Sequence, residues 1–132
     1  MRLVIALGGN VLVKRGEAMT AGIEAVIDKD RASELLARQL KADMLLLLTD
    51  VDAVYRDFGE PTARAIAIVG ARALQPDQFA AGSMGPKIEA ATRFAQATDG
   101  RAAIGRLQDA AAILQGKAGT TIVAGDAAIE FR

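Results

Sequence analysis

The stretch LVIALGGN at residues 3–10 decides the fold class of this chain. Its first five residues are apolar, include β-branched Val4 and Ile5, and are followed at once by two glycines. A short run that is apolar on both sides is typical of a strand buried on two faces, as in parallel sheets. The glycines after it let the backbone approach a phosphate and point N–H groups at its oxygens. Taken alone, Gly8-Gly9 also fits a simple tight turn, because it has neither the Walker spacing nor the GxGxxG pattern.

The remaining chain alternates short apolar blocks with helical patterns. Strands are predicted at residues 44–48, 66–69, 101–104 and 120–123, and helices from Asp30, over residues 86–97 and over residues 107–114. The block MLLLL at residues 44–48 also fits a helix, but its shortness and polar flanks favour a buried strand. Strands that alternate with helices predict an α/β fold in which helices cover a parallel or mixed sheet.

Each predicted helix has an apolar face at helical spacing. In the helix from Asp30, four apolar residues predict the buried face: Ala32, Leu35, Leu36 and Leu40. Charged residues of that helix, among them Glu34 and Arg38, are expected largely outside this face. The other two helices have corresponding apolar sets: Ile88, Ala91 and Ala95, and Leu107, Ala110, Ala111 and Leu114.

The composition limits what the chain can do. Its 132 residues fit one domain, and the 52% apolar share with only 4% aromatic residues predicts an aliphatic core. Sixteen basic and 16 acidic residues cancel, so no net field attracts nucleic acid or an anionic membrane. Cysteine and histidine are both absent, which excludes disulfides, thiolate chemistry and a phosphohistidine intermediate. With no signal peptide and no stretch near the ~20 apolar residues of a membrane span, a soluble, cytoplasmic protein is expected.

Lys29 lies between two aspartates just before a predicted helix. A helix start offers free N–H groups and a partial positive charge, so a lysine there can serve an anion. Asp28 or Asp30 could orient that lysine or help to hold Mg²⁺. In the alternative interpretation Asp30 is only an N-cap and Lys29 is solvated.

Lys87 stands in a similar place, in the first turn of the helix after the loop GSMGP at residues 82–86. A cation is unfavourable at that end of the helix dipole unless an anion neutralises it. Together, the two lysines and the Gly8-Gly9 turn would form a cradle for a polyphosphate such as that of ATP. Without histidine or cysteine, the natural chemistry of such a cradle is direct in-line phosphoryl transfer.

Read together, these segments resemble the carbamate kinases of the amino acid kinase superfamily. The similar motifs keep the family's order and lie at residues 4–10, 22–30, 48–55, 82–90 and 119–120. The resemblance implies a three-layer αβα sandwich with a mostly parallel sheet, in truncated form. Family members are more than twice as long, and here the segment ending near Ala21 is joined directly to the half that begins at Gly22. Missing are the family's His-Gly-Asn-Gly-Pro loop beside the carbamate, a protruding subdomain with a further phosphate-contacting lysine, and a glycine-rich run.

The resemblance also implies a reaction and its residues. ATP and carbamate would interconvert with ADP and carbamoyl phosphate, with Mg²⁺ as the cofactor and no protein ligand to the metal assigned, in a homodimer. The residues implied at the reacting groups are Gly8, Gly9, Asn10, Asp28, Lys29 and Lys87. The residues implied at the nucleotide are Thr49, Asp50 and Tyr55 beside the nucleoside, and Met84 and Lys87 closing over ATP and its terminal phosphates.

Three functions remain open at this point. The chain is a compact phosphotransferase, a nucleotide-binding module without efficient catalysis, or a remnant that associates with itself. The first is favoured by the retained glycines and lysines, and the second by the loss of the acceptor half of the family pattern. The third follows from the apolar surface that removal of half a sandwich would uncover.

Overall fold

The structure is a computed structural model, and it describes residues 1–7, 29–74 and 84–132. The elements follow one another as β1 (Leu3–Leu7), α3 (Lys29–Gln39), β2 (Met44–Thr49), β3 (Tyr55–Arg56), β4 (Arg64–Gly70), α4 (Met84–Thr98), β5 (Arg101–Arg106), the 3₁₀ helix η2 (Leu107–Asp109), α5 (Ala110–Leu114), β6 (Thr120–Val123) and β7 (Glu130–Phe131). The four strands predicted beyond the first are confirmed as β2, β4, β5 and β6. Strands β3 and β7 have two residues each and gave no signal in the sequence.

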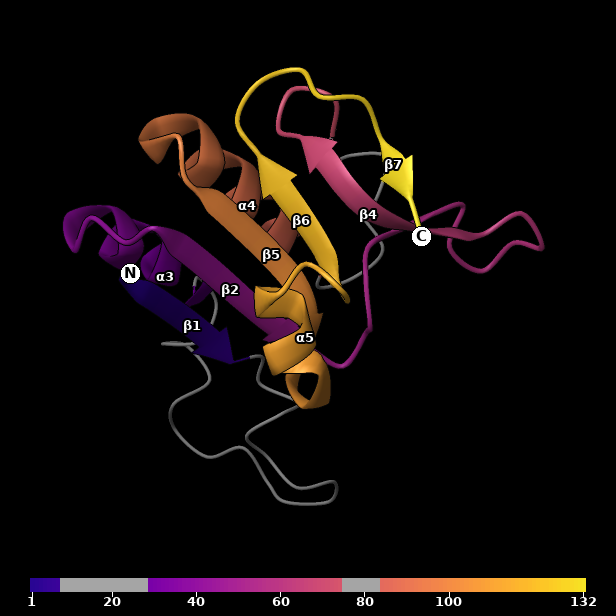
Figure 1. Cartoon of the computed structure of the whole chain (residues 1–132), viewed down its shortest axis with the longest axis horizontal. Helices are drawn as coiled ribbons and strands as arrows, with labels where there is room; N and C mark the ends of the chain where they lie inside the picture. Colours follow the sequence, from indigo (N-terminus) through magenta and orange to yellow (C-terminus); the bar gives the residue numbers. More distant parts are fainter. Residues whose placement is uncertain (8–28, 75–83) are drawn as a thin grey trace.

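One mixed sheet of seven strands organises the molecule, in the order β1-β2-β5-β6-β4-β3, with β7 paired to β4. Strands β1, β2 and β5 pair in parallel, and β4 pairs in parallel with β6. Because β5 and β6 are antiparallel, these two parallel groups run in opposite directions. Helices α3 and α4 cover one face of the sheet and α5 lies on the other (Figure 1). The predicted α/β layering is therefore confirmed.

The core is aliphatic, as the composition predicts. All six residues of β2 are buried, which confirms that the MLLLL block is a central strand. On the α3–α4 side the core includes Leu45, Leu47, Ile88 and Phe94, which is the one fully buried aromatic residue in the described part of the chain. In α4 the predicted inner residues Ile88, Ala91 and Ala95 are all buried.

The predicted inner face of α3 is wrong. The buried residues of this helix are Asp30, Glu34 and Ala37. The residues expected to be buried are exposed: Ala32, Leu35, Leu36 and Leu40.

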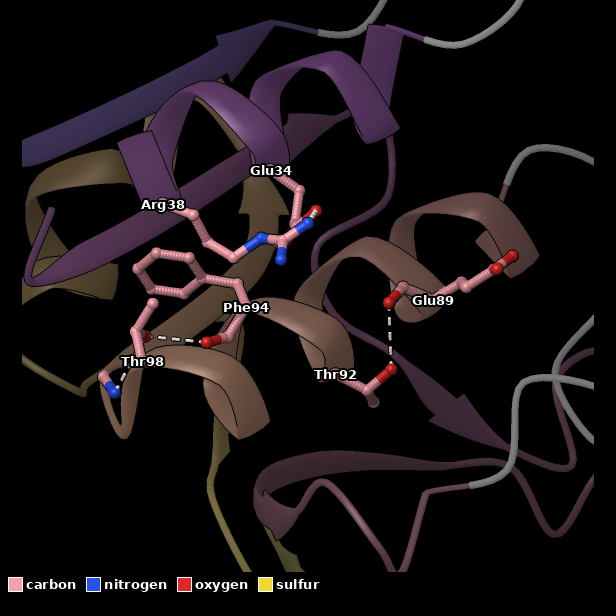
Figure 2. Close-up of polar contacts among 7 residues, drawn as sticks. Glu34, Arg38, Glu89, Thr92, Phe94 and Thr98 are labelled. Atoms are coloured by element: carbon pink, nitrogen blue, oxygen red, sulfur yellow. Dashed lines mark hydrogen bonds and ion pairs between the residues drawn. The ribbon is translucent and has the colours of Figure 1, made fainter. Parts of the chain in front are cut away.

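Burial of a carboxylate in α3 is possible because of its ion partner. Arg38 forms an ion pair with Glu34 one turn earlier, and its Nη2 donates to Glu34 Oε2 at 3.2 Å. Figure 2 shows this pair between α3 and α4. The spacing of the leucines predicts an apolar inner face, but the buried face of α3 instead contains Glu34 and its ion pair with Arg38.

The helix predicted over residues 107–114 is also different in the structure. It divides into η2 and the short α5, and only Ile113 is buried. Leu107 and Leu114, predicted as inner residues, are 48% and 38% exposed. Among the helices in the described ranges, none has the length and apolar character to cross a membrane.

Candidate functional site

The candidate site lies at the edge of the sheet where β1, β2 and β5 end. These strands are parallel, so their carboxyl ends share one edge. Helix α3 begins there, because its first residue, Lys29, contacts the end of β1. Helix α4 begins beside it, because Lys87 in its first turn contacts Asp30 of α3. The end of α3 is held at the start of β1, where Arg2 Nη1 donates to the Leu40 carbonyl at 2.8 Å. The carboxyl edge of parallel strands, faced by helix N-termini, is where α/β folds bind phosphate-bearing ligands.

Lys29, the first residue of α3, points to the end of β1. Its Nζ donates to the carbonyl oxygen of Leu7 at 3.5 Å. Leu7 is the last residue of β1 and directly precedes the two glycines in the sequence. The lysine is half-buried, so the interpretation of a freely solvated side chain is wrong. The lysine thus lies beside the strand end that leads into the predicted phosphate turn.

Lys87 and Asp30 form a buried ion pair that joins α4 to α3. The Nζ of Lys87 lies 3.4 Å from Oδ2 of Asp30, and the two side chains are 4% and 10% exposed. Asp30 lies inside α3, so its interpretation as a simple N-cap is wrong. Its carboxylate instead orients the ammonium of Lys87. The first-turn position of Lys87 was predicted from the sequence, but its burial was not.

The two ammonium groups affect one another. Burial lowers the pKa of the Lys29 ammonium, the positive charge of Lys87 lowers it further, and Asp30 offsets part of the effect. Two cations close enough to repel are stabilised together by an anion placed between them. The arrangement therefore favours a ligand with several negative charges over a neutral one.

The predicted nucleoside residues continue along the same edge. Thr49 ends β2, is buried, and donates from Oγ1 to Asp50 Oδ1 at 3.1 Å. The hydroxyl of Tyr55, the first residue of β3, donates to Asp52 Oδ2 at 2.9 Å. That hydrogen bond is the main cause that raises the pKa of the Tyr55 phenol, with burial second. Met84 begins α4 and packs against the main core.

Two residues of this edge were missed by sequence reasoning. Asp52 accepts the hydrogen bond of the Tyr55 hydroxyl, and it lies within residues 48–55, one of the segments that resemble carbamate kinases. Arg106 ends β5 directly opposite Thr49 in the strand register, and it pairs through Nη2 with Asp109 at 2.9 Å. Only the register of β2 and β5 could have placed Arg106 beside Thr49.

Four predicted site residues lie outside the described residues: Gly8, Gly9, Asn10 and Asp28. A metal site built from acidic side chains is absent from residues 1–7, 29–74 and 84–132. No group of three or more acidic side chains in these ranges is arranged to hold an ion. Asp30 already forms an ion pair with Lys87.

Comparison with known proteins defines the class. The amino acid kinase family matches residues 3–105, which is most of the chain. This chain therefore belongs to the amino acid kinase family. Within that family its similarity is to carbamate kinases. It is 50% identical to the carbamate kinase of Haemophilus influenzae over 101 residues, which are 76% of this chain and 33% of that protein. It is 47% identical to that of Rhizobium meliloti over 124 residues, 91% of this chain and 38% of that protein.

Solved structures agree with this assignment. Carbamate kinase from Giardia lamblia bound to AMP-PNP superposes with a TM-score of 0.71 at 41% identity, covering 85% of this chain and 37% of that one. UMP kinase from Bacillus anthracis shares the fold alone, with a TM-score of 0.60 at 12% identity over 99% of this chain and 61% of that one. The chain thus spans between a third and two fifths of the length of these carbamate kinases.

Proposed function

We propose that this chain binds ATP and ADP at the carboxyl edge of β1, β2 and β5 and acts as a carbamate kinase-type phosphotransferase. The observation that carries the proposal is the pair of ammonium groups of Lys29 and Lys87 at the starts of two helices, beside the end of β1. The nucleotide seen in the Giardia relative supports a nucleotide as the ligand of this fold.

In the proposed reaction a carbamate oxygen attacks the γ-phosphorus of ATP, and the bond from that phosphorus to the oxygen of ADP breaks. Lys29 and Lys87 neutralise the charge on the phosphoryl oxygens, and Asp30 holds Lys87 in place. Gly8 and Gly9 would contact the transferring group with their N–H groups, Asn10 would lie near the carbamate, and Asp28 would position the phosphate-binding groups.

The proposed nucleoside contacts are Thr49, Asp50 and Tyr55, and Met84 would close over the bound ATP. The described residues offer no acidic cluster for a metal, so we propose that Mg²⁺ is held chiefly by the phosphates of the nucleotide. We also propose a homodimer that works in the cytoplasm.

The alternative to a phosphotransferase is a nucleotide-binding module without efficient catalysis. It is favoured because the chain matches only 33% of the length of the carbamate kinase of Haemophilus influenzae. A coupled assay for ATP formation from carbamoyl phosphate and ADP separates the two functions. Turnover that depends on both lysines supports the phosphotransferase. Saturable ADP binding in calorimetry without turnover supports the module, and absence of both contradicts a nucleotide site altogether.

The lowered pKa of Lys29 gives a prediction about pH. At alkaline pH, between its lowered pKa and its ordinary value, part of the free protein lacks the Lys29 proton. A polyphosphate beside the lysine raises that pKa, so binding takes up a proton and affinity falls as pH rises through this range. Calorimetry in two buffers of different ionisation enthalpy measures the uptake.

The control for this experiment is Lys29→Met, which keeps the length of the side chain and removes the charge. The variant should bind ADP more weakly and take up no proton. Wild-type binding without any proton uptake at alkaline pH would contradict the placement of Lys29 against the phosphates.

A further inference from the structure

Arg106 places a cation at the same edge of the sheet as Lys29 and Lys87. The parallel strands β1, β2 and β5 end in Leu7, Thr49 and Arg106, of which only Arg106 carries a charge. Its backbone is still extended, with φ −85° and ψ 151°, so the alternation of side chains along β5 continues to this residue. Ile104, two residues earlier, lies in the core on the α3–α4 side. The side chain of Arg106 therefore leaves β5 on the face that carries the starts of these two helices.

Thr49 is the neighbour of Arg106 across the sheet. The two residues pair in the register of β2 and β5. Thr49 lies on the same face as Arg106, because Leu47, two residues before it, belongs to the same core as Ile104. Thr49 is one of the proposed nucleoside contacts, so Arg106 lies next to the place proposed for the nucleoside.

The segment after β2 passes close to the end of β5. A Cβ atom at Gly105 would lie 3.3 Å from the carbonyl oxygen of Asp52, so the glycine permits this approach. The carboxylate of Asp52 accepts the hydrogen bond of the Tyr55 hydroxyl. The hydrogen bond to Asp109 is the main cause that raises the pKa of Arg106, and the nearby charges of Asp52 and Tyr55 raise it further. Arg106 and Tyr55 therefore border the same part of the edge.

Asp109 fixes the orientation of the Arg106 guanidinium. Both Nε and Nη2 of Arg106 lie 2.9 Å from Oδ2 of Asp109. Within residues 1–7, 29–74 and 84–132, Nη1 has no hydrogen-bond partner. The arginine side chain is 41% exposed, so a ligand can reach it. Arg106 thus offers two N–H donors of Nη1 from a group that is already held in place.

The strand spacing sets the distance from Arg106 to the two lysines. Strand β2 lies between β1 and β5, so the end of β5 is about 10 Å from the end of β1. Lys29 contacts the end of β1, at the Leu7 carbonyl. A nucleoside diphosphate with its phosphates at Lys29 and Lys87 extends far enough along the edge to bring its nucleoside to the end of β5. Arg106 then meets the nucleoside and not the phosphates.

We propose that Arg106 is a specificity-determining residue that binds the nucleoside half of the nucleotide, with Asp109 as its positioning residue. The two N–H groups of Nη1 donate to acceptor atoms of the base, such as the ring nitrogens of a purine. An arginine has donors and no acceptor, so the site favours a base that presents acceptors. The inference rests on the proposed nucleotide site and adds a base contact to it.

Calorimetry with ADP and with inorganic pyrophosphate tests the proposal, because pyrophosphate has two linked phosphates and no nucleoside. Arg106→Met should weaken ADP binding by about 10-fold or more, since a hydrogen bond from a charged donor is lost, and should leave pyrophosphate binding unchanged. Arg106→Lys should also weaken ADP binding, because an ammonium keeps the charge but not the planar group that Asp109 orients. Arg101→Met is the matched control: it removes an exposed arginine from the other end of β5 and should bind both ligands as the wild type does.

The outcomes separate this inference from the proposed function. Wild-type protein that binds neither ADP nor pyrophosphate contradicts the nucleotide site itself, and the role of Arg106 falls with it. Wild-type ADP binding that Arg106→Met leaves unchanged overturns the role of Arg106 alone. Equal losses for ADP and pyrophosphate would mean that Arg106 acts on the phosphates or through the fold, and full ADP affinity in Arg106→Lys would mean that only its charge matters. Either of these results overturns the proposal.

Discussion

Replacing Lys87 with alanine is expected to abolish most nucleotide-dependent function and to destabilise the fold at the same time. Loss of one preorganised charge contact costs about 10²–10³ in the rate of phosphoryl transfer. The same change leaves the carboxylate of Asp30 buried without its ammonium partner at 3.4 Å. Breaking a buried ion pair from one side typically costs about 3–5 kcal/mol of unfolding free energy. The coupled assay and urea denaturation measure the two effects separately.

A double variant separates function from stability. Lys87→Ala with Asp30→Ala removes both charges, so much of the stability lost in the single variant should return. Phosphate binding should not return, because the ammonium is still missing. Lys117→Ala, a lysine on the exposed surface, is the control and should change neither quantity. Recovery of binding in the double variant would show that Lys87 acts only through the fold.

Phe94→Ala is expected to have the largest effect on stability alone. Among residues 1–7, 29–74 and 84–132, Phe94 is the largest of the fully buried side chains, and its ring lies between α3 and α4 (Figure 2). Truncation of a buried phenylalanine typically costs about 3–5 kcal/mol, because transfer energy is lost and a cavity remains. The variant would therefore unfold at a much lower urea concentration.

The matched control for Phe94 is Phe58→Ala. Phe58 is 66% exposed, in the turn that follows β3. Its truncation should change the unfolding free energy by no more than about 0.5 kcal/mol, as at other surface sites. Equal losses in the two variants would contradict the assignment of the core to the space beneath α3 and α4.

The sequence predicted the sheet and the inner face of α4 well, and the inner faces of α3 and of residues 107–114 poorly. For β2 a strand was favoured over a helix because the block of five apolar residues is short and has polar flanks, and the structure confirms the strand. The inner face of α3 was missed because Glu34 is buried through its ion pair with Arg38, and helical spacing counts every glutamate as polar. Leu35, Leu36 and Leu40 of the same helix are exposed, and periodicity within one helix does not show which of its faces packs against the sheet.

For the candidate site, the sequence predicted which helix starts carry lysines. The structure adds the partners of these lysines, which are the Leu7 carbonyl for Lys29 and the Asp30 carboxylate for Lys87. Nothing local in the sequence links Asp30 to Lys87, because 57 residues separate them. Their pairing depends on the packing of α3 against α4. Arg106 was missed for the same reason, since only the register of two strands brings it opposite Thr49.

The most direct test of the proposed site is a crystal structure of this chain with ADP or a non-hydrolysable ATP analogue. The account predicts that the phosphates lie at the carboxyl edge of the sheet, within hydrogen-bonding distance of Nζ of both Lys29 and Lys87 and next to the end of β1. A nucleotide bound elsewhere on the molecule, or phosphates that touch neither lysine, would contradict it.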